Sequence, residues 1–367
     1  MRLARLVWSP QLLEYDFGRG HPMSPVRLEL TMRRIEALGL LDQPTLEVVD
    51  AVPATDAVLE TVHDAAYIAA VRRAEATHEP DPLRGLGTED DPLFAGMHEA
   101  AARQLAGSVD LATALWAGEI AHGVNVAGGM HHAMPGAASG FCVYNDAAAA
   151  VRRLLDLGAE RVAYLDFDAH HGDGVEAIFW DHPRVLTISV HEDGRILFPG
   201  TGASSDVGAP GAAEGTAVNI PVPPRTSGAA WLRAIDAVVP ALVREHRPQA
   251  IVSQHGCDAH GRDPLSHLNV SVDAQRTAQR WAHELAHQHA DGRWLALGGG
   301  GYAMADVVPR AWSALVAEAA HVSLERGAEV PFRSWDEGYD PADGVDRAVM
   351  ATRRAVFPLW GLDPMLD

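Results

Sequence analysis

Residues 162–174 of the chain read VAYLDFDAHHGDG, an apolar run that turns abruptly into aspartate, histidine and glycine. Short apolar runs of this kind, each bounded by Gly, Asp or His, recur along the chain and are typical of buried strands. They predict strands at residues 46–52, 123–127, 162–165, 185–190, 250–253 and 294–297. Ala-rich stretches with a helical period separate them, for example at residues 96–116, 145–157, 229–245, 274–289 and 304–322. This alternation predicts an α/β fold with right-handed βαβ units and an open, mostly parallel sheet flanked by helices on both faces.

The domain organisation follows from what the pattern lacks. We find no internal repeat, low-complexity linker or block of charge that would separate two domains, so residues 1–323 are predicted to form one domain. Residues 324–367 lose the strand pattern and contain Pro331 and Trp335. This segment is predicted to be a C-terminal extension packed on the same domain.

The charge of the chain excludes several classes of partner and mechanism. There are 29 basic against 49 acidic residues, a formal net charge of −20, so nucleic acid and anionic membrane surfaces are not expected as partners. Every basic residue is Arg. The absence of Lys excludes a Schiff-base lysine, a pyridoxal phosphate site and a P-loop lysine.

The cellular setting is also predicted from composition. No apolar run approaches the roughly 20 residues needed to span a bilayer, and the first eight residues contain no signal-peptide core. The two cysteines, Cys142 and Cys257, cannot form a disulfide framework. We therefore expect a cytoplasmic protein without membrane partners; the sequence does not indicate its oligomeric state.

Reactive side chains follow the predicted strands directly. In open parallel sheets, ligands bind outside the carboxyl ends of the strands. The segments at these ends are GGMHH at residues 128–132, DFDAHHGDG at 166–174, His191 with FPGTG at 198–202, QHGCD at 254–258 and GGGGY at 298–302. We expect these five strand ends to converge on one site.

A metal site is predicted within this group. Asp168 and His170 are two residues apart on an extended segment, so their side chains point to the same side. Asp258, at another strand end, would supply a third ligand. Two carboxylates and one imidazole suit Zn²⁺ or Fe²⁺ with a position left open for water and substrate, and such an ion activates water to attack an amide carbonyl.

Acid–base groups are predicted beside the metal. The tandem pair His131 and His132 would need carboxylates to orient the imidazoles, and Asp166 and Asp173 flank the metal pair without being used by it. Tyr302 follows four glycines that permit close backbone approach, and its phenol could stabilise an oxyanion.

Together these segments resemble the histone deacetylase and acetylpolyamine amidohydrolase superfamily. The likeness begins at GHPMSPVR, residues 20–27, passes through GTEDDP, residues 87–92, and the strand ends, and finishes at Tyr302. Within the superfamily, the chain looks most like the bacterial acetoin-utilisation deacetylase branch. The resemblance implies an arginase-like α/β fold and a deacetylase catalytic domain over residues 1–323.

The resemblance also implies roles for individual residues. Three residues would bind zinc: Asp168, His170 and Asp258. His132, paired with Asp173, would be the principal general base and acid, and His131, paired with Asp166, would supply electrostatic support. Tyr302 would polarise the acetyl carbonyl.

Further residues follow from the same resemblance. Four would contact the substrate: Asp90 at the rim, Gly140, and the two aromatic walls of an acyl-lysine tunnel, Phe141 and Phe198. Arg27 stands where the superfamily has an arginine below the active site. An inner potassium site would use Asp166, Asp168, His170, Ser189 and Val190, several of them through backbone oxygens.

The expected function is zinc-dependent hydrolysis of acetyl-lysine in proteins to free lysine and acetate. An acetylated polyamine is the alternative substrate, since both products are cations that suit an acidic protein. A binuclear manganese ureohydrolase shares the fold but needs further carboxylates where this chain has Gly172 and His260. A non-catalytic acyl-lysine binder is disfavoured because the ligands, both His–Asp pairs and Tyr302 are all present.

Overall fold

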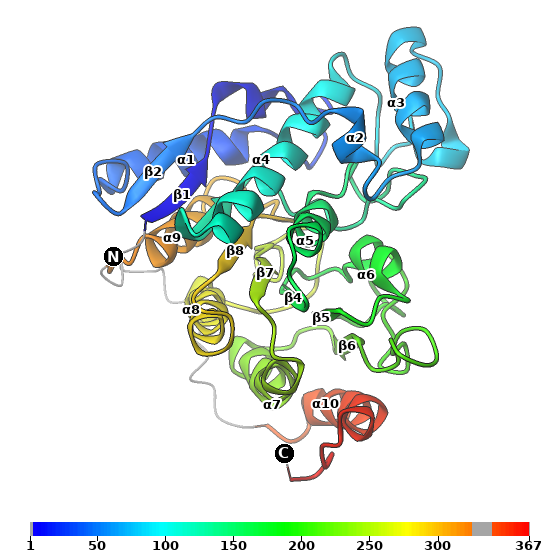
Figure 1. Ribbon diagram of the computed structural model, residues 1–367, viewed down its shortest axis with the longest axis vertical. Coiled ribbons are helices and arrows are strands. Elements are labelled where there is room, and N and C mark those ends of the chain that lie inside the picture. The colour runs from blue at the N-terminus through cyan, green and yellow to red at the C-terminus, as the bar shows by residue number, and fades with distance from the viewer. Residues whose placement is uncertain (1–2, 325–339, 367) are drawn as a thin grey trace.

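One parallel sheet organises the part of the chain described by the computed structural model, residues 3–324 and 340–366 (Figure 1). Its strands are β1 Leu3–Val7, β2 Leu46–Val49, β3 Ile120–Asn125, β4 Val162–Asp166, β5 Val185–Glu192, β6 Ala217–Val222, β7 Ala250–Gln254 and β8 Trp294–Leu297. They lie in the order β2-β1-β3-β8-β7-β4-β5-β6, and every hydrogen-bonded pair is parallel. Every residue of β4, β5, β7 and β8 is buried, as expected of strands covered on both faces.

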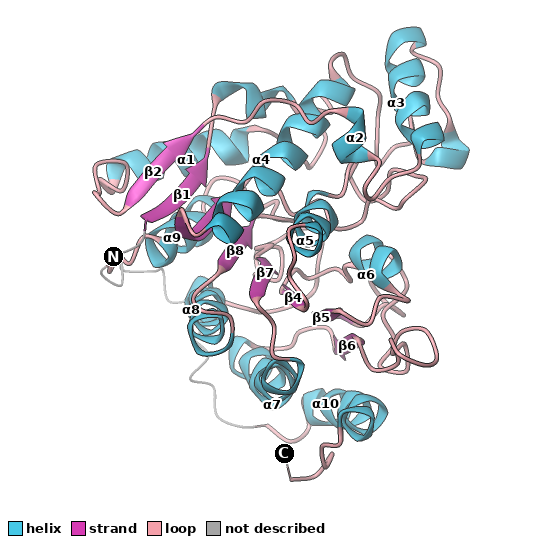
Figure 2. Cartoon of the chain, viewed as in Figure 1, coloured by secondary structure: helices cyan, strands magenta, loops and turns pink. Residues whose placement is uncertain are grey.

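Helices cover both faces of the sheet, as Figure 2 shows by colour. They are α1 Val26–Ala37, α2 Asp56–Leu59, α3 Ala65–Thr77, α4 Met97–Ala117, α5 Asp146–Asp156, α6 Asp173–Phe179, α7 Gly228–His246, α8 Val272–His289, α9 Val307–Ala319 and α10 Val345–Val356. Short 3₁₀ turns occupy Pro10–Glu14, Pro82–Arg84 and Phe357–Trp360. Helices α4, α5 and α6 pack together on one face, and α1, α9, α8 and α7 on the other (Figure 1). The predicted α/β class with an open parallel sheet is confirmed.

Side-chain caps fix where several of these helices begin. The side chains of Asn145, Ser227 and Ser271 accept hydrogen bonds from backbone N–H groups in the first turns of α5, α7 and α8. Each cap satisfies a donor that the helix itself leaves unpaired. These helices begin within two residues of the predicted positions.

Two strands were not predicted from the sequence. Strand β1 was missed because the charged Arg5 interrupts its apolar run; in the structure Arg5 forms ion pairs with Glu47 of β2 and with Glu119. Strand β6 contains Asn219 and Pro221 and forms one edge of the sheet, pairing only with β5. A proline is tolerated there because an edge strand has no neighbour to receive its missing N–H.

The segment after residue 339 lies against the sheet and its covering helices. Helix α10 packs on α7 and β6, and Thr352 Oγ1 donates a 2.6 Å hydrogen bond to the Asn219 carbonyl. Trp360 Nε1 donates to the Gly215 carbonyl at 2.8 Å. The division of the chain at residue 323 stays a prediction, and Pro331 and Trp335 lie outside the described residues. Among the described helices, none has the length and apolarity to span a bilayer.

Candidate active site

The four central strands β3, β8, β7 and β4 lie side by side, so the loops after them meet at one edge of the sheet. Asp168 and His170 follow β4, and Asp258 follows β7. His170 Nδ1 lies 3.1 Å from Asp168 Oδ1 and 3.0 Å from Asp258 Oδ2. The three predicted metal ligands therefore converge, and all three are buried.

Hydrogen bonds orient each carboxylate of this triad. Asp168 Oδ2 accepts hydrogen bonds from Gln254 Nε2 and the Gly300 N–H, both at 2.8 Å. Asp258 Oδ1 accepts the Ala169 N–H at 2.9 Å. The opposite oxygen of each carboxylate is therefore turned toward the imidazole of His170.

The donor set fits a divalent cation. Burial and the negative charge of Asp168 raise the pKa of Asp258 to about 7. The two buried carboxylates therefore repel each other, and the residues around them do not fully compensate their negative charge. Two carboxylates and one imidazole are ligand types that Zn²⁺ and Fe²⁺ accept, and a cation between them would compensate their charge.

The tandem histidines pair with separate carboxylates, as predicted. His131 Nδ1 donates to Asp166 Oδ2 at 2.8 Å, and His132 Nδ1 donates to Asp173 Oδ1 at 2.6 Å. These bonds place a proton on Nδ1, and the tautomer leaves Nε2 of a neutral imidazole as an acceptor.

The two imidazoles differ in charge despite their proximity. Burial alone would lower the pKa of His131, but the negative charges of Asp166 and Asp168 raise it to about 9. Burial, together with the positive charge of His131, lowers the pKa of His132 to about 4. At neutral pH, His132 is therefore the neutral partner, able to accept a proton.

Buried polar groups that sequence reasoning missed hold the loop carrying both histidines. Asp146 accepts hydrogen bonds from the N–H groups of Gly129 and Met130, at 2.9 and 2.8 Å. Asn145 Nδ2 donates to the carbonyls of His131 and Ala133. The helix α5 N-terminus thus fixes the position of the histidine pair.

A cavity of about 190 Å³ leads to this edge of the sheet. Its lining combines predicted and unpredicted residues: Asp90, His132, Gly140, Phe141, His170, Leu197, Phe198, Leu265 and Tyr302. Phe198 packs edge-on against His132, with ring centroids 5.0 Å apart, and Phe141 packs edge-on against Tyr302 at 5.8 Å. The predicted aromatic walls and the rim residue Asp90 do share one cavity; Leu197 and Leu265 were missed.

Gly140 is required for this packing. A Cβ atom there would lie 2.5 Å from His132 Cδ2 and 2.8 Å from Phe198 Cε1, and the φ angle of +54° also favours glycine. Tyr15 holds the next residue in place, because its hydroxyl donates to the Phe141 carbonyl at 2.8 Å and accepts the Val143 N–H at 3.2 Å. No local pattern marks Tyr15, since 126 residues separate it from Phe141.

Tyr302 is positioned by an unpredicted carboxylate. Asp263 Oδ2 accepts the backbone N–H of Tyr302 at 2.7 Å, and Asp263 Oδ1 accepts that of Leu265 at 3.0 Å. Burial, followed by the negative charge of Asp258, raises the pKa of Tyr302 well above its usual value of 10. The phenol therefore keeps its proton and can serve as a donor.

The glycine run before Tyr302 allows the close approach predicted for it. A Cβ at Gly300 would lie 2.0 Å from Asp258 Oδ2. Arg27, buried beneath this loop, donates from Nη1 to the Gly299 carbonyl at 2.8 Å and lies over the Trp312 ring.

The predicted potassium ligands lie on the adjacent strands β4 and β5 and in the loop that follows β4. Asp166 and Ser189 are buried and pair in register between β4 and β5. Ser189 Oγ lies 2.9 Å from His191 Nδ1. Carboxylate, hydroxyl and carbonyl oxygens suit a hard cation, and a potassium ion held with Asp168, His170 and Val190 stays a prediction.

Comparison with known proteins agrees with this arrangement. Residues 21–319 match the family model described as the histone deacetylase domain. Acetoin utilization protein AcuC of Bacillus subtilis (strain 168) is 40% identical over 334 residues, covering 90% of this chain and 85% of that protein. AcuC of Staphylococcus xylosus is 36% identical over 310 residues, covering 84% of this chain and 80% of its own. AcuC of Staphylococcus aureus (strain MSSA476) is 36% identical over 348 residues, covering 93% of this chain and 85% of that protein.

The matched region contains both His–Asp pairs, the buried triad and Tyr302. The resemblance inferred from the sequence, to histone deacetylases and within them to the acetoin-utilisation branch, is confirmed. With the deacetylase-like parallel sheet and a family match over most of its length, the chain belongs to the histone deacetylase domain family.

Proposed function

We propose that the chain is a metal-dependent amidohydrolase that removes the acetyl group from an N-acetylated amine, giving acetate and the free amine. The observation that carries this proposal is the buried triad Asp168, His170 and Asp258 in contact with a cavity that also reaches His132 and Tyr302. Membership of the histone deacetylase domain family supports a hydrolytic deacetylation.

The triad would hold a Zn²⁺ ion, with Fe²⁺ as the alternative of similar ligand preference. A bound ion of this kind supplies a Lewis acid that polarises the acyl carbonyl and makes water a better nucleophile near neutral pH. A single ion is favoured over the binuclear manganese pair of a ureohydrolase. A Cβ at Gly172 would lie only 2.3 Å from Asp166 Oδ2, so a bridging carboxylate has no room there.

The two histidines take different roles in the reaction. His132, neutral and oriented by Asp173, takes the proton of the attacking water on Nε2 and later returns it to the leaving amine. His131, cationic beside Asp166, stabilises the negative charge that develops on the acyl oxygen in the tetrahedral intermediate. Their different charge states support this division.

The remaining groups bind and orient the substrate. The phenol of Tyr302 donates to the acyl oxygen, and the rings of Phe141 and Phe198 enclose the alkyl chain of the substrate. Asp90 is exposed at the cavity, where it can accept a hydrogen bond from a substrate N–H.

Protein acetyl-lysine is the substrate class that we favour. Phe198 is 43% exposed and Asp90 is also exposed, so the groups proposed to hold substrate are accessible to a surface loop of another protein. An acetylated polyamine is the second candidate, because the chain carries a net charge of −20 and would attract a polycation.

Acetate release tests the proposal. Chelator-stripped, Zn²⁺-loaded and Asp258→Ala protein would be compared on an acetyl-lysine peptide and an acetylpolyamine, with Asp42→Ala as an exposed aspartate control. We expect Zn²⁺-dependent turnover that Asp258→Ala abolishes and Asp42→Ala retains, and a faster reaction with the peptide. A faster reaction with the polyamine would reverse the substrate assignment. No turnover of either substrate by metal-loaded protein would overturn the proposal in favour of a binding role.

A further inference from the structure

Four histidines lie close together at the amino ends of the strands, whereas the candidate active site lies at their carboxyl ends. His122 lies in β3 and pairs in register with Trp294, the first residue of β8. His283 and His287 lie in the last two turns of α8, and His321 follows the end of α9. One ring nitrogen from each of these residues lies within 4.8 Å of the others. We call this group the four-histidine cluster; nothing in the proposed reaction uses it.

Hydrogen bonds fix two of the imidazoles with a bare nitrogen facing the centre. His122 Nδ1 donates to the Ala319 carbonyl at 2.7 Å, and His283 Nδ1 donates to Glu318 Oε1 at 2.7 Å. A carbonyl and a carboxylate accept only, so the proton of each neutral ring is on Nδ1 and its Nε2 carries a lone pair.

Those two lone pairs compete for one donor. His287 Nε2 lies 3.3 Å from His122 Nε2 and 3.0 Å from His283 Nε2. His287 has at most one proton on that nitrogen, so it cannot donate fully to both partners. A cation at the centre would satisfy every inward lone pair at once.

The two nitrogen–nitrogen separations around His287 are close to those of tetrahedral coordination. Ligand–metal distances of about 2.0–2.1 Å place tetrahedral nitrogen ligands about 3.3–3.4 Å apart, close to the separations around His287. Histidine ligands usually donate their other ring N–H to a carboxylate or a backbone carbonyl. Glu318 and the Ala319 carbonyl already fill those two positions.

The surrounding electrostatics also favour a cation. The carboxyl-terminal ends of α8 and α9, which carry partial negative charge, both point at the cluster. Although burial opposes ionisation, the hydrogen bond from His283 lowers the pKa of Glu318. Burial lowers the pKa of His122 to about 3 and also lowers the pKa values of His287 and His321.

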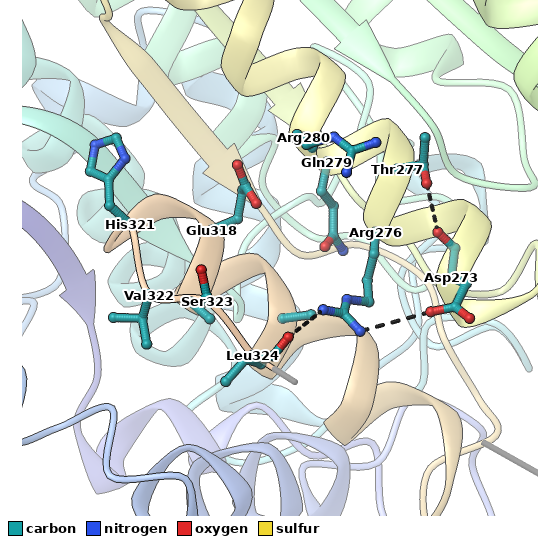
Figure 3. A pocket seen from close by; sticks show the side chains of 12 residues that line it. Asp273, Arg276, Thr277, Gln279, Arg280, Glu318, His321, Val322, Ser323 and Leu324 are labelled. Atoms are coloured by element: carbon teal, nitrogen blue, oxygen red, sulfur yellow. Dashed lines mark hydrogen bonds and ion pairs between the residues drawn. The ribbon is translucent and has the colours of Figure 1, made fainter. Parts of the chain in front are cut away.

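Solvent can reach the cluster from one side. His122 and His283 are buried, whereas His287 and His321 are exposed. Figure 3 shows His321 and Glu318 at one end of a surface cavity of about 410 Å³, whose other end is formed by Asp273 and Arg276. An ion can therefore enter without unfolding the chain.

We propose that the four-histidine cluster is a second metal site, which binds a divalent transition metal ion with a preference for imidazole, such as Zn²⁺ or Ni²⁺. The ion would tie the end of α8 to β3 and to the segment after α9. Its role is structural, because the site lies at the amino ends of the strands and the candidate active site lies at their carboxyl ends.

The test is Zn²⁺ binding by tag-free, chelator-stripped protein, measured by titration calorimetry and elemental analysis. The cluster variant would be His287→Ala/His321→Gly. Both positions are exposed, alanine suits the helix, and glycine suits the φ of +56° at His321, so this variant is expected to fold. Removal of two further histidines outside the cluster, His78→Gly/His289→Ala, is the matched control, since His78 also has a φ of +56° and His289 also lies in α8.

We expect the control to bind two equivalents of Zn²⁺ and the cluster variant to bind one. In the Asp258→Ala background, one equivalent should remain and should disappear when the cluster variant is added. Glu318→Gln should weaken this equivalent about 10–100-fold, as loss of a carboxylate behind a ligand does elsewhere. Equal stoichiometry in the cluster variant and the control would overturn the proposal.

These arms separate the two metal sites. If the candidate active site bound no metal, the control would bind one equivalent and the cluster variant none. Thermal unfolding gives a second readout, since Zn²⁺ should raise the Tm of the Asp258→Ala protein and leave that of the combined variant unchanged. No rise in Tm of the Asp258→Ala protein would contradict the structural role.

Discussion

The imidazoles of His131 and His132 lie with ring centroids 4.0 Å apart, yet their pKa values shift in opposite directions. The pKa of His131 is raised to about 9, because the negative charges of Asp166 and Asp168 stabilise the imidazolium by more than burial destabilises it. The pKa of His132 is lowered to about 4 by burial and by the positive charge of the neighbouring His131. Adjacent residues of the same type thus acquire different chemistry from the carboxylates around them.

This difference predicts unequal effects of substitution. His132→Ala should lower kcat about 10²–10⁴-fold, the usual contribution of a positioned general base. His131→Ala should have a smaller effect, because it removes a charge and leaves the proton acceptor in place. Steady-state kinetics on an acetyl-lysine peptide would measure both. A larger loss in His131→Ala would assign the base to the other histidine.

Removal of the Tyr302 hydroxyl should affect the chemical step more than binding. Tyr302→Phe keeps the ring packed against Phe141 but deletes the donor, so kcat should fall about 10²–10³-fold with little change in KM. Near-full activity of this variant would exclude an oxyanion-stabilising role for the phenol.

Asp263 should act through Tyr302. Asp263→Ala removes the acceptor of the Tyr302 backbone N–H and should lower kcat by less than Tyr302→Phe does. In the double variant Asp263→Ala/Tyr302→Phe, the two losses in kcat should not add. Asp263 acts by positioning the phenol hydroxyl, so its removal has no further effect once that hydroxyl is absent. Fully multiplicative losses in the kinetic double-mutant cycle would show that Asp263 acts independently.

Asp91 predicts a pH dependence of stability. Its side chain is buried, and burial, followed by the charge of Asp90, raises its pKa from 3.8 to about 8. Between pH 4 and pH 8 the folded chain holds a proton that the unfolded chain has lost. The free energy of unfolding should therefore fall as pH rises, by up to about 1.4 kcal/mol per unit from this group.

Asp91→Asn should flatten this dependence, because an amide does not titrate. Urea unfolding at pH 5, 6, 7 and 8 would compare the variant with wild type and with the exposed control Asp42→Asn. An unchanged slope in Asp91→Asn would show that Asp91 is already ionised in the folded chain.

The metal triad should not tolerate a side chain at Gly300. In Gly300→Ala, the new methyl group would lie 2.0 Å from Asp258 Oδ2 and would displace that carboxylate. We expect at least a tenfold loss of Zn²⁺ affinity at the triad, comparable to loss of an orienting contact. Titration in the His287→Ala/His321→Gly background isolates this site, and circular dichroism checks the fold. Unchanged affinity would show that Asp258 is not a ligand.

Local patterns in the sequence were sufficient for the central strands and for the residues that follow them. Strands β4, β5, β7 and β8 are buried on both faces and read as continuous apolar runs. Strand β6 was missed because it contains Pro221, and a proline argues against a strand unless that strand lies at the edge of the sheet. The position of β6 at the edge, beside β5, is a property of the tertiary structure. Boundaries of the predicted helices differ from those observed by a few residues at most.

The sequence by itself determined the parallel α/β class, the set of strand ends that carry Asp, His and Tyr, and the family likeness, because each depends on spacing within short segments. Tertiary structure alone decided which carboxylate meets which histidine, how Tyr15 and Asp263 hold residues distant in sequence, and that His122 meets three other histidines. Some of these contacts join residues far apart in the chain, as between His122 and His321. The physical reason is that strand order sets such contacts, and strand order results from packing the whole sheet.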